Sequence, residues 1–228
     1  MTDKLDKRKL PTIADLNLNI DLGKLRESTD RLADKFTDVR SANPMLCDNH
    51  MELVKSVYDN FEQINLTTPS EILPHTTSIK ERIKRREEHL YNVPTEDYTG
   101  SYFEEIVTQC KSKASRIRIT KLAPGKMIPW HVDYDVNYGV RCIIPIYGSD
   151  NVVNLFKRDN EVQAYTLKDG TANFLNIGFQ HAVVNMSTKP RIALMFTLDG
   201  TEDLKFLVEP KNRLEQMASL THDPIAYC

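Results

Sequence analysis

Two histidines, one aspartate and one arginine in the second half of the chain have the types and spacing of an iron site. His131 and Asp133 are one residue apart, and Arg191 stands ten residues beyond His181. Two histidines and a carboxylate can bind one face of an iron(II) ion and leave the other face open. An arginine can hold a carboxylate through two parallel hydrogen bonds. The pattern predicts a non-haem iron oxygenase that uses O2 and 2-oxoglutarate.

The spacing of the first two residues fits a β-strand. Alternate strand residues point to the same face, so His131 and Asp133 would project together while Val132 turns away. His181 opens a later strand-like segment, which we expect to lie beside the first. A turn at about 186–190 then predicts an antiparallel hairpin, with Arg191 ~10–13 Å along from the point opposite His181. The far carboxylate of a metal-chelating 2-oxoglutarate would reach into that gap.

Further residues are candidates for cofactor and substrate contacts. Thr120 or Thr197 would add a hydroxyl donor to the 2-oxoglutarate site, and Asn185 is expected to stabilise a turn. A loop after the first ligand pair would form the rim of the substrate site, where Asp135 or Asn137 would meet an amine. The candidate substrate residues are Trp130, Tyr134, Asp135, Asn137 and Asn154. The structural alternatives are packing for the aromatic residues, a core role for His181 and a surface position for Arg191.

The chain changes character near residue 112. Before it, the segments 22–36, 51–64, 78–90 and 102–110 have the polarity or the 3.6-residue period of helices. After it, short apolar segments alternate with turn signals such as Pro124-Gly125 and Asp169-Gly170. Eight or nine short strands at this spacing predict a sandwich or barrel, with a jelly roll among the options. The expected strands are 116–123, 126–132, 138–148, 151–157, 161–167, 172–177, 181–186, 191–198 and 204–209.

We expect one domain over residues 1–228, mainly β with flanking helices. Residues 1–111 would be a mostly helical region packed on the barrel, because no linker separates the two halves. Residues 112–210 would form the jelly-roll core, and 211–228 a C-terminal tail. The length, the 40% of hydrophobic residues and the 27% of charged residues are ordinary for a soluble globular protein.

The net charge and the cysteine content indicate which cellular location and which classes of partner to expect. The net charge of −2 gives no electrostatic basis for a nucleic-acid partner. No stretch reaches the roughly 18 apolar residues of a membrane span, and the start, MTDKLDKRKL, lacks the apolar segment of a secretory signal. The four cysteines form no CxxC pair, and Cys142 lies in an apolar segment, so we expect a buried thiol and a cytoplasmic protein. The oligomeric state stays open.

Residues 116–198 resemble the aspartyl/asparaginyl β-hydroxylase-like family of 2-oxoglutarate oxygenases, which also includes free-proline hydroxylases. The resemblance lies in RIRITKLAPGKMIPWHVD, in Arg141 ahead of Ile143-Ile144-Pro145, and in FLNIGFQHAVVNMSTKPRIALMF. The last piece is the most specific, because it contains His181, Asn185 four residues later and Arg191 at plus ten.

The resemblance implies a double-stranded β-helix (a cupin-like jelly roll) that binds Fe(II), 2-oxoglutarate and O2. It makes His131, Asp133 and His181 the metal ligands and Arg191 the residue that grips the far carboxylate of 2-oxoglutarate. Arg141 falls where the family has a second arginine, near the co-substrate or the substrate's carboxylate. The implied reaction hydroxylates an amino acid, free or in a peptide, and releases succinate and CO2.

The sequence departs from the family pattern at two points, and other functions stay open. Asp133 is present where the β-hydroxylases that name the family lack the acidic ligand, which places the chain nearer the free amino-acid hydroxylases. Ile143 stands where some members have a histidine, so the substrate does not follow from the resemblance. The same chemistry on another small metabolite or a nucleobase is one alternative. A non-catalytic, metal-binding, cupin-like sensor is another, although such a protein has no need of Arg191.

Overall fold

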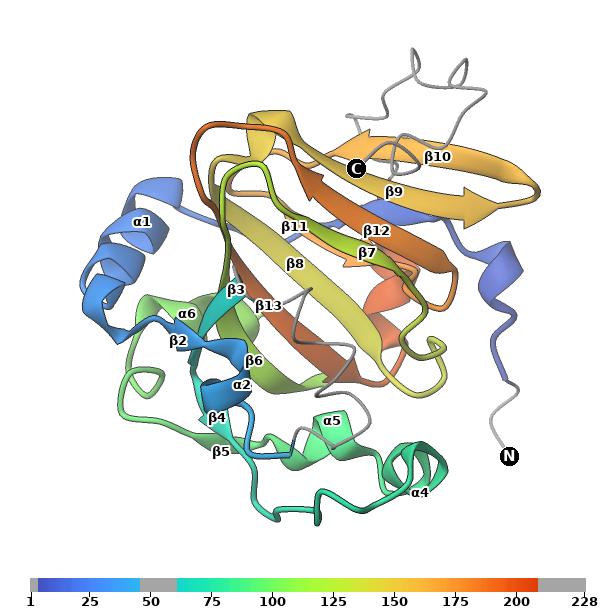
Figure 1. The fold of residues 1–228 in the computed structure, drawn as a ribbon, viewed down its shortest axis with the longest axis horizontal. Coiled ribbons are helices and arrows are strands. Elements are labelled where there is room, and N and C mark those ends of the chain that lie inside the picture. Colours follow the sequence, from blue (N-terminus) through green and yellow to red (C-terminus); the bar gives the residue numbers. More distant parts are fainter. Residues whose placement is uncertain (1–3, 46–60, 209–228) are drawn as a thin grey trace.

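The computed structural model describes residues 4–45 and 61–208, and most of these elements are strands (Figure 1). The strands are β1 (Ile13–Leu16), β2 (Thr37–Asp38), β3 (Phe61–Asn65), β4 (Thr67–Thr68), β5 (Val93–Pro94), β6 (Lys113–Leu122), β7 (Met127–His131), β8 (Val140–Tyr147), β9 (Val152–Arg158), β10 (Glu161–Thr166), β11 (Ala172–Leu175), β12 (Gln180–Asn185) and β13 (Arg191–Asp199). The helices are α1 (Leu22–Asp30), α2 (Val39–Ala42), α4 (Ile79–Lys84), α5 (Glu87–Leu90) and α6 (Tyr102–Val107), with 3-10 turns η1 (Lys7–Lys9), η2 (Ala33–Lys35), η3 (Ser149–Asn151) and η4 (Glu202–Phe206).

Two antiparallel sheets face each other and form the core. The large sheet has the order β1-β11-β8-β13-β6-β3-β2, and the small sheet has the order β10-β9-β12-β7. Figure 1 shows the small sheet lying over the large one, and between β6 and β13 the chain passes repeatedly from one sheet to the other. The predicted double-stranded β-helix with flanking helices is therefore confirmed.

Each face of the large sheet has its own apolar layer, because strand side chains alternate between faces. On the inner face, Ile143 and Ala193 pack with Phe156 of the small sheet. On the outer face, side chains such as Ile144 and Phe196 join one cluster with residues of α1 and α6. These two helices lie on the side of the large sheet away from the small sheet (Figure 1).

Eight of the nine expected strands are present as β6 to β13, and the ninth prediction is wrong. The segment 204–209 was expected to be a strand, but its first residues belong to the 3-10 turn η4. The carboxylate of Asp203 accepts hydrogen bonds from the backbone N–H groups of Lys111 (2.7 Å) and Ser112 (2.9 Å), which holds this turn against the start of β6. Among the described residues of this segment, Val208 makes an isolated bridge to Asp15.

The prediction of a mostly helical region before residue 112 holds only in part. Residues 22–36, 78–90 and 102–110 contain α1, α4, α5 and α6, but the same region adds β1, β2 and β3 to the large sheet. Most of the segment 51–64 lies outside the described residues, and its end forms β3 instead of a helix. The tail 211–228 also lies outside the described residues, and the division into domains stays a prediction.

Segment 78–90 is interrupted where Arg86 adopts a left-handed conformation (φ 54°). Exposed apolar side chains of this part of the chain include Ile79 and Ile83 on α4.

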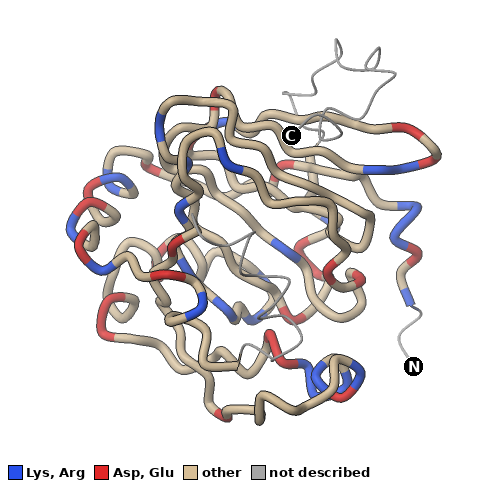
Figure 2. Tube along the Cα trace, in the orientation of Figure 1, with Lys and Arg blue, Asp and Glu red and all other residues tan. Residues whose placement is uncertain are grey.

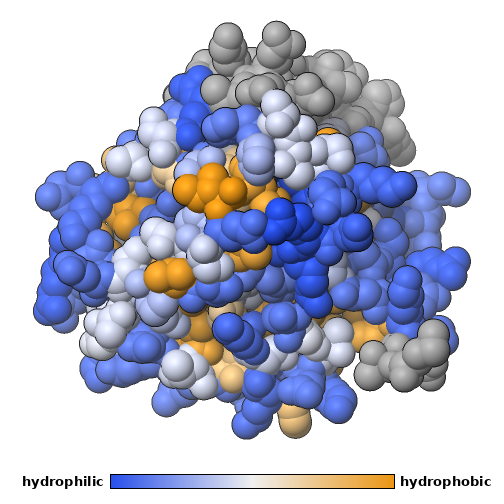
Figure 3. All heavy atoms as spheres, turned by 90° about the horizontal axis from the view of Figure 1, so that it is seen from below, coloured by the Kyte–Doolittle hydropathy of each residue, from blue (hydrophilic) through white to orange (hydrophobic). Residues whose placement is uncertain are grey.

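Seen from below, the apolar side chains at the surface of the molecule form small separate groups among hydrophilic ones (Figure 3). Within the described ranges, no helix has the length and apolarity needed to cross a membrane.

The expected hairpin between the strands of His181 and Arg191 is wrong. β12 pairs with β7 and β9 in the small sheet, whereas β13 pairs with β6 and β8 in the large sheet. The turn at 186–190 therefore crosses from one sheet to the other. A turn signal in the sequence does not distinguish a hairpin from such a crossing. The predicted separation between Arg191 and the point opposite His181 assumed the hairpin and therefore has no basis.

Asn185 stabilises this crossing, as expected. Its buried amide donates to the carbonyls of Leu122 (3.1 Å), Ala123 (3.1 Å) and Lys189 (2.9 Å). Its carbonyl oxygen accepts from the backbone N–H (3.1 Å) and the hydroxyl (2.7 Å) of Ser187. One side chain thus joins the end of β12, the start of β13 and the end of β6.

We expect Asn185→Ala to lower the free energy of unfolding by roughly 2–4 kcal/mol, because buried carbonyls lose their donors. Urea unfolding at neutral pH measures this change. Thr188→Ala, on the exposed part of the same turn, is the matched control and should stay within about 0.5 kcal/mol of the parent. A loss below about 1 kcal/mol in Asn185→Ala would contradict the assigned role.

Candidate metal centre

The fold brings His131, Asp133 and His181 together. His131 ends β7 and stands directly opposite His181 of β12 in the antiparallel pair. The ring centroids of the two histidines are 4.1 Å apart, and His131 Nε2 lies 3.7 Å from Asp133 Oδ1. One donor atom from each of the three residues lies within 4.8 Å of the other two. This is the separation expected of ligands around a single metal ion.

Backbone carbonyls fix both imidazole rings in the form that binds a metal through Nε2. His131 Nδ1 lies 2.7 Å from the carbonyl oxygen of Pro129, and His181 Nδ1 lies 3.0 Å from that of Phe179. A carbonyl only accepts, so in both rings Nδ1 carries a proton and Nε2 is the nitrogen left to bind a metal. Metal-binding histidines are oriented in this way by a carbonyl or carboxylate behind the ring.

The third ligand and the protonation state of His181 also suit a metal. Asp133 is held by a 3.2 Å hydrogen bond from its backbone N–H to the carbonyl of Ile177, and Val132 turns outward, 57% exposed. Burial, together with the neighbouring His131, lowers the pKa of His181 to about 4, so the ring is neutral near pH 7. Two imidazoles and one carboxylate form the donor set that iron(II) oxygenases use with open positions.

The inner face of the small sheet continues from the metal centre. The Phe156 ring lies nearly parallel to the His181 ring, at 5.6 Å between centroids. Asn154, two residues before it on β9, is buried at 2%, and its Oδ1 has no hydrogen-bond partner among the described residues. Asn154 therefore offers an unused acceptor on the side of the sheet that carries His181, as strand alternation predicts.

Arg191 opens β13 on the inner face of the large sheet and is buried at 3%. Within residues 4–45 and 61–208, its guanidinium has no ion pair and no hydrogen bond, and burial alone lowers its pKa to about 10. An unpaired buried charge is costly, so this arginine suits an anionic ligand. Thr120 lies on the neighbouring strand β6, and its buried hydroxyl donates to the carbonyl of Ala193 (3.3 Å).

Arg141 lies on β8 beside the aspartate ligand and belongs to a buried charged group. Its Nη2 lies 3.8 Å from Asp133 Oδ2, 3.2 Å from Glu88 Oε2 and 2.5 Å from the Tyr134 hydroxyl. The Thr197 hydroxyl lies 2.8 Å from that of Tyr134. Tyr134 therefore faces the interior, and burial raises its pKa well above the usual value. Arg141 connects this group to the metal centre.

Two further arginines complete the group, which we call the arginine cluster (Arg116, Arg118 and Arg141). Arg116 Nε and Arg118 Nη1 each lie 3.9 Å from an oxygen of Glu88. Burial raises the pKa of Glu88, but the three arginines outweigh burial and hold it at about 2. Arg116 Nε and Nη1 and Arg141 Nε have no hydrogen-bond partner among the described residues. Figure 2 marks basic positions along β6 and β8 within the large sheet.

One candidate substrate residue, Trp130, faces away from the metal centre. Trp130 points to the outer face of the small sheet, where it packs near Leu155 and Ala182 and under the ammonium of Lys157 (4.4 Å). Its position next to His131 in a strand explains this, because neighbouring residues face opposite sides. The placement argues against a substrate contact.

Asp135 and Asn137 form a turn instead of an amine site. The Asp135 carboxylate accepts from the backbone N–H of Asn137 (3.0 Å), and its own carbonyl accepts from Tyr138 (2.8 Å). The Asn137 side chain binds the backbone of Leu5 through its Oδ1 (2.8 Å) and Nδ2 (2.9 Å). These two side chains are therefore occupied by the protein itself.

Sequence reasoning missed Glu88, Arg116 and Arg118. Glu88 lies in the polar segment 78–90, which has the composition of a solvated helix. The arginines alternate within RIRIT, and charged residues at every second position of an otherwise apolar strand are a usable signal of a charged interior.

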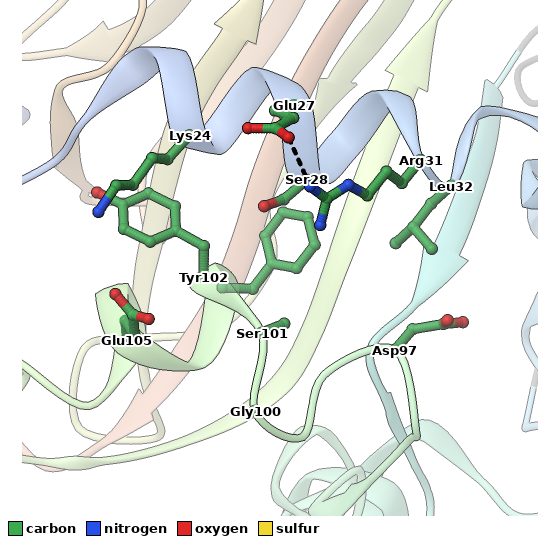
Figure 4. A pocket seen from close by; sticks show the side chains of 11 residues that line it. Lys24, Glu27, Ser28, Arg31, Leu32, Asp97, Gly100, Ser101, Tyr102 and Glu105 are labelled. Carbon is green, nitrogen blue, oxygen red and sulfur yellow. Dashed lines mark hydrogen bonds and ion pairs between the residues drawn. The ribbon is translucent and has the colours of Figure 1, made fainter.

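A separate cleft of about 390 Å³ lies between α1 and the segment 97–105. Figure 4 shows its lining, which includes the ion pair between Glu27 and Arg31. The lining contains none of the metal-centre or arginine-cluster residues. This cleft lies with α1 and α6 on the outer side of the large sheet and is not part of the candidate centre.

Three solved structures are among the partial matches to this chain. An oxidoreductase of the 2OG-Fe(II) oxygenase family from Burkholderia pseudomallei is 14% identical, with 60% of this chain and 65% of that chain covered and a TM-score of 0.37. The Lactobacillus farciminis oxalate decarboxylase formate complex is 11% identical (62% and 30% covered, TM-score 0.36). A cupin domain from Bordetella pertussis is 15% identical (40% and 88% covered, TM-score 0.31). The chain thus spans less than a third of the oxalate decarboxylase.

At the level of sequence, no curated protein matches the chain. The family described as Aspartyl/Asparaginyl beta-hydroxylase matches residues 58–199. This match covers more than half of the chain and contains the three candidate ligands, the arginine cluster and Arg191. The chain belongs to the aspartyl/asparaginyl β-hydroxylase family.

Proposed function

We propose that this protein is an Fe(II)- and 2-oxoglutarate-dependent dioxygenase that hydroxylates an amino acid, free or within a peptide. The observation that carries the proposal is Arg191, a buried cation that has no counter-ion among the described residues. It lies on the inner face of the large sheet, whereas His181 lies on the inner face of the small sheet. Iron(II) with 2-oxoglutarate and O2 supplies the hydroxylation of a C–H bond, with succinate and CO2 as the other products.

Different residues of the chain would bind the metal, bind 2-oxoglutarate and exclude water. His131 and His181 would hold the iron through Nε2, and Asp133 through its carboxylate. Arg191 would bind the far carboxylate of 2-oxoglutarate, with the Thr120 hydroxyl on the neighbouring strand as a second donor. The apolar inner layer around Phe156 and Ile143 excludes water from this space.

The arginine cluster favours an anionic group on the substrate. Three guanidinium groups, of which those of Arg116 and Arg141 are buried, face one carboxylate, Glu88, and Asp133 would be engaged by the metal. The group keeps a surplus of positive charge and unused N–H donors on Arg116 and Arg141. A carboxylate of an amino-acid substrate would satisfy both, whereas an ammonium group would be repelled.

The test is turnover by the purified protein with Fe(II), 2-oxoglutarate and O2 across a panel of free amino acids and short peptides. We expect succinate release coupled to the gain of one oxygen atom by a carboxylate-bearing substrate. His131→Ala and Asp133→Ala should lose metal binding and turnover while the barrel stays folded. Full turnover in either variant would make the ligand assignment wrong. Binding of metal and 2-oxoglutarate without any succinate release would favour the sensor alternative.

Arg191→Ala should raise the concentration of 2-oxoglutarate needed for half-maximal turnover by at least about tenfold. The lost charge-assisted pair is worth roughly 1.5–3 kcal/mol, while metal affinity should not change. Lys189→Ala, an exposed lysine on the adjoining turn, is the matched control. An unchanged 2-oxoglutarate requirement in Arg191→Ala would move this role to another residue, with Arg141 the first to examine.

Glu88→Gln should destabilise the fold by about 3 kcal/mol at pH 7, because the pKa of Glu88 is held at about 2. A carboxylate with a lowered folded-state pKa stabilises fully above its ordinary pKa of about 4.5, and this contribution is lost as the pH falls toward 2. Urea unfolding should therefore show the difference between parent and variant shrinking from pH 7 to pH 3. Glu161→Gln, at an exposed glutamate of β10, serves as control, and a pH-independent difference would contradict the assignment.

A further inference from the structure

The loop between β11 and β12 touches two of the three candidate metal ligands. In this segment, 176–179, which we call the ligand loop, the carbonyl of Ile177 accepts from the backbone N–H of Asp133 (3.2 Å). The carbonyl of Phe179 accepts from Nδ1 of His181 (3.0 Å). The position of this short loop therefore sets the approach of Asp133 and the rotation of the His181 ring.

A segment from the start of the chain holds the ligand loop in place. Residues 5–12, which we call the N-terminal strap, precede the part of the chain that matches the family. Asn176 donates from its backbone N–H to the carbonyl of Thr12 (2.9 Å) and from its side-chain amide to the carbonyl of Lys7 (2.9 Å). The first residue of the ligand loop is thus fixed at two points of the strap.

Lys7 makes the closest contact between the strap and the ligand loop. Its Nζ donates to the carbonyl of Gly178 at 2.5 Å and lies 5.1 Å from the centre of the Phe179 ring. A Cβ atom at Gly178 would lie 3.2 Å from Lys7 Cδ and 3.5 Å from the carbonyl oxygen of Tyr134. The glycine is therefore closely packed between the strap and the loop that follows Asp133.

The strap is anchored at both ends. Arg158 at the end of β9 donates to the carbonyls of Arg8 (2.6 Å) and Leu10 (2.8 Å). Leu5 exchanges two backbone hydrogen bonds with the side chain of Asn137, in the loop after Asp133. The strap thus connects the loop that contains Asp133 with the ligand loop that precedes His181. Its contacts described here are to these loops and to β9, and none is to a candidate ligand.

We propose that Lys7 is a positioning residue of the metal centre, acting through the ligand loop on Asp133 and His181. This inference rests on the proposed metal site. Loss of the Lys7 ammonium would free the Gly178 carbonyl, relax the loop at the point between its two ligand contacts, and weaken metal binding. The partners that orient metal ligands typically change metal affinity by 10–100-fold when removed, and a residue one step further away belongs at the lower end of that range.

The test measures binding of Co(II), whose visible absorption reports the ligand geometry without any turnover. Lys7→Met keeps the alkyl stem against Phe179 and removes the donor, and we expect the Co(II) dissociation constant to rise about tenfold. Lys7→Arg should restore binding, and Lys9→Met, an exposed lysine in the same strap, should leave it unchanged. The unfolding midpoint of the metal-free Lys7→Met protein should match that of the parent.

Two results would overturn the inference. One is a Co(II) dissociation constant in Lys7→Met within twofold of the parent. The other is a loss of affinity matched by an equal loss of stability in the metal-free protein, which would show a structural role only. Two other results would instead contradict the metal site on which the proposed function rests. One is a parent protein that does not bind Co(II), and the other is a His181→Ala variant that binds Co(II) as tightly as the parent.

Discussion

The pairing of β7 with β12 is the constraint on which the rest of the site depends. Its register sets His131 opposite His181, and the register shifts between His181 and Val183. Such irregularities re-aim side chains and are frequent beside active sites. With the two rings fixed by the carbonyls of Pro129 and Phe179, Asp133 needs only to follow the strand by two residues to complete the set.

The interior beyond this pairing holds charge in two different ways. In the arginine cluster, Glu88 compensates part of the buried positive charge and is itself stabilised as an anion. At Arg191 no described residue does so. A protein that keeps an uncompensated arginine inside an apolar layer gives up stability. Under the proposed function, binding of the 2-oxoglutarate carboxylate would restore this stability. By the same reasoning, the proposal places an anionic group of the substrate near the surplus positive charge at Arg141.

Local patterns predicted what depends on local geometry. The two-residue period of strands placed His131 and Asp133 together, and turn signals located β6 to β13. Alternation along the strands also accounts for Asn154 on the inner face and Trp130 on the outer face of the small sheet. Long-range pairing was not accessible in this way, since nothing in the turn at 186–190 shows that it crosses between sheets. Lys7 and Glu88 were missed for the same reason, because their partners are far away in the sequence.

The joint binding of iron and 2-oxoglutarate is tested most directly without oxygen. Fe(II) and 2-oxoglutarate are added anaerobically to the metal-free protein, and the visible charge-transfer band of chelated 2-oxoglutarate is followed. We expect the band in the parent protein and its loss in His181→Ala. A protein that is folded and binds metal but gives no band, or a band that persists in His181→Ala, would contradict the assignment of this centre.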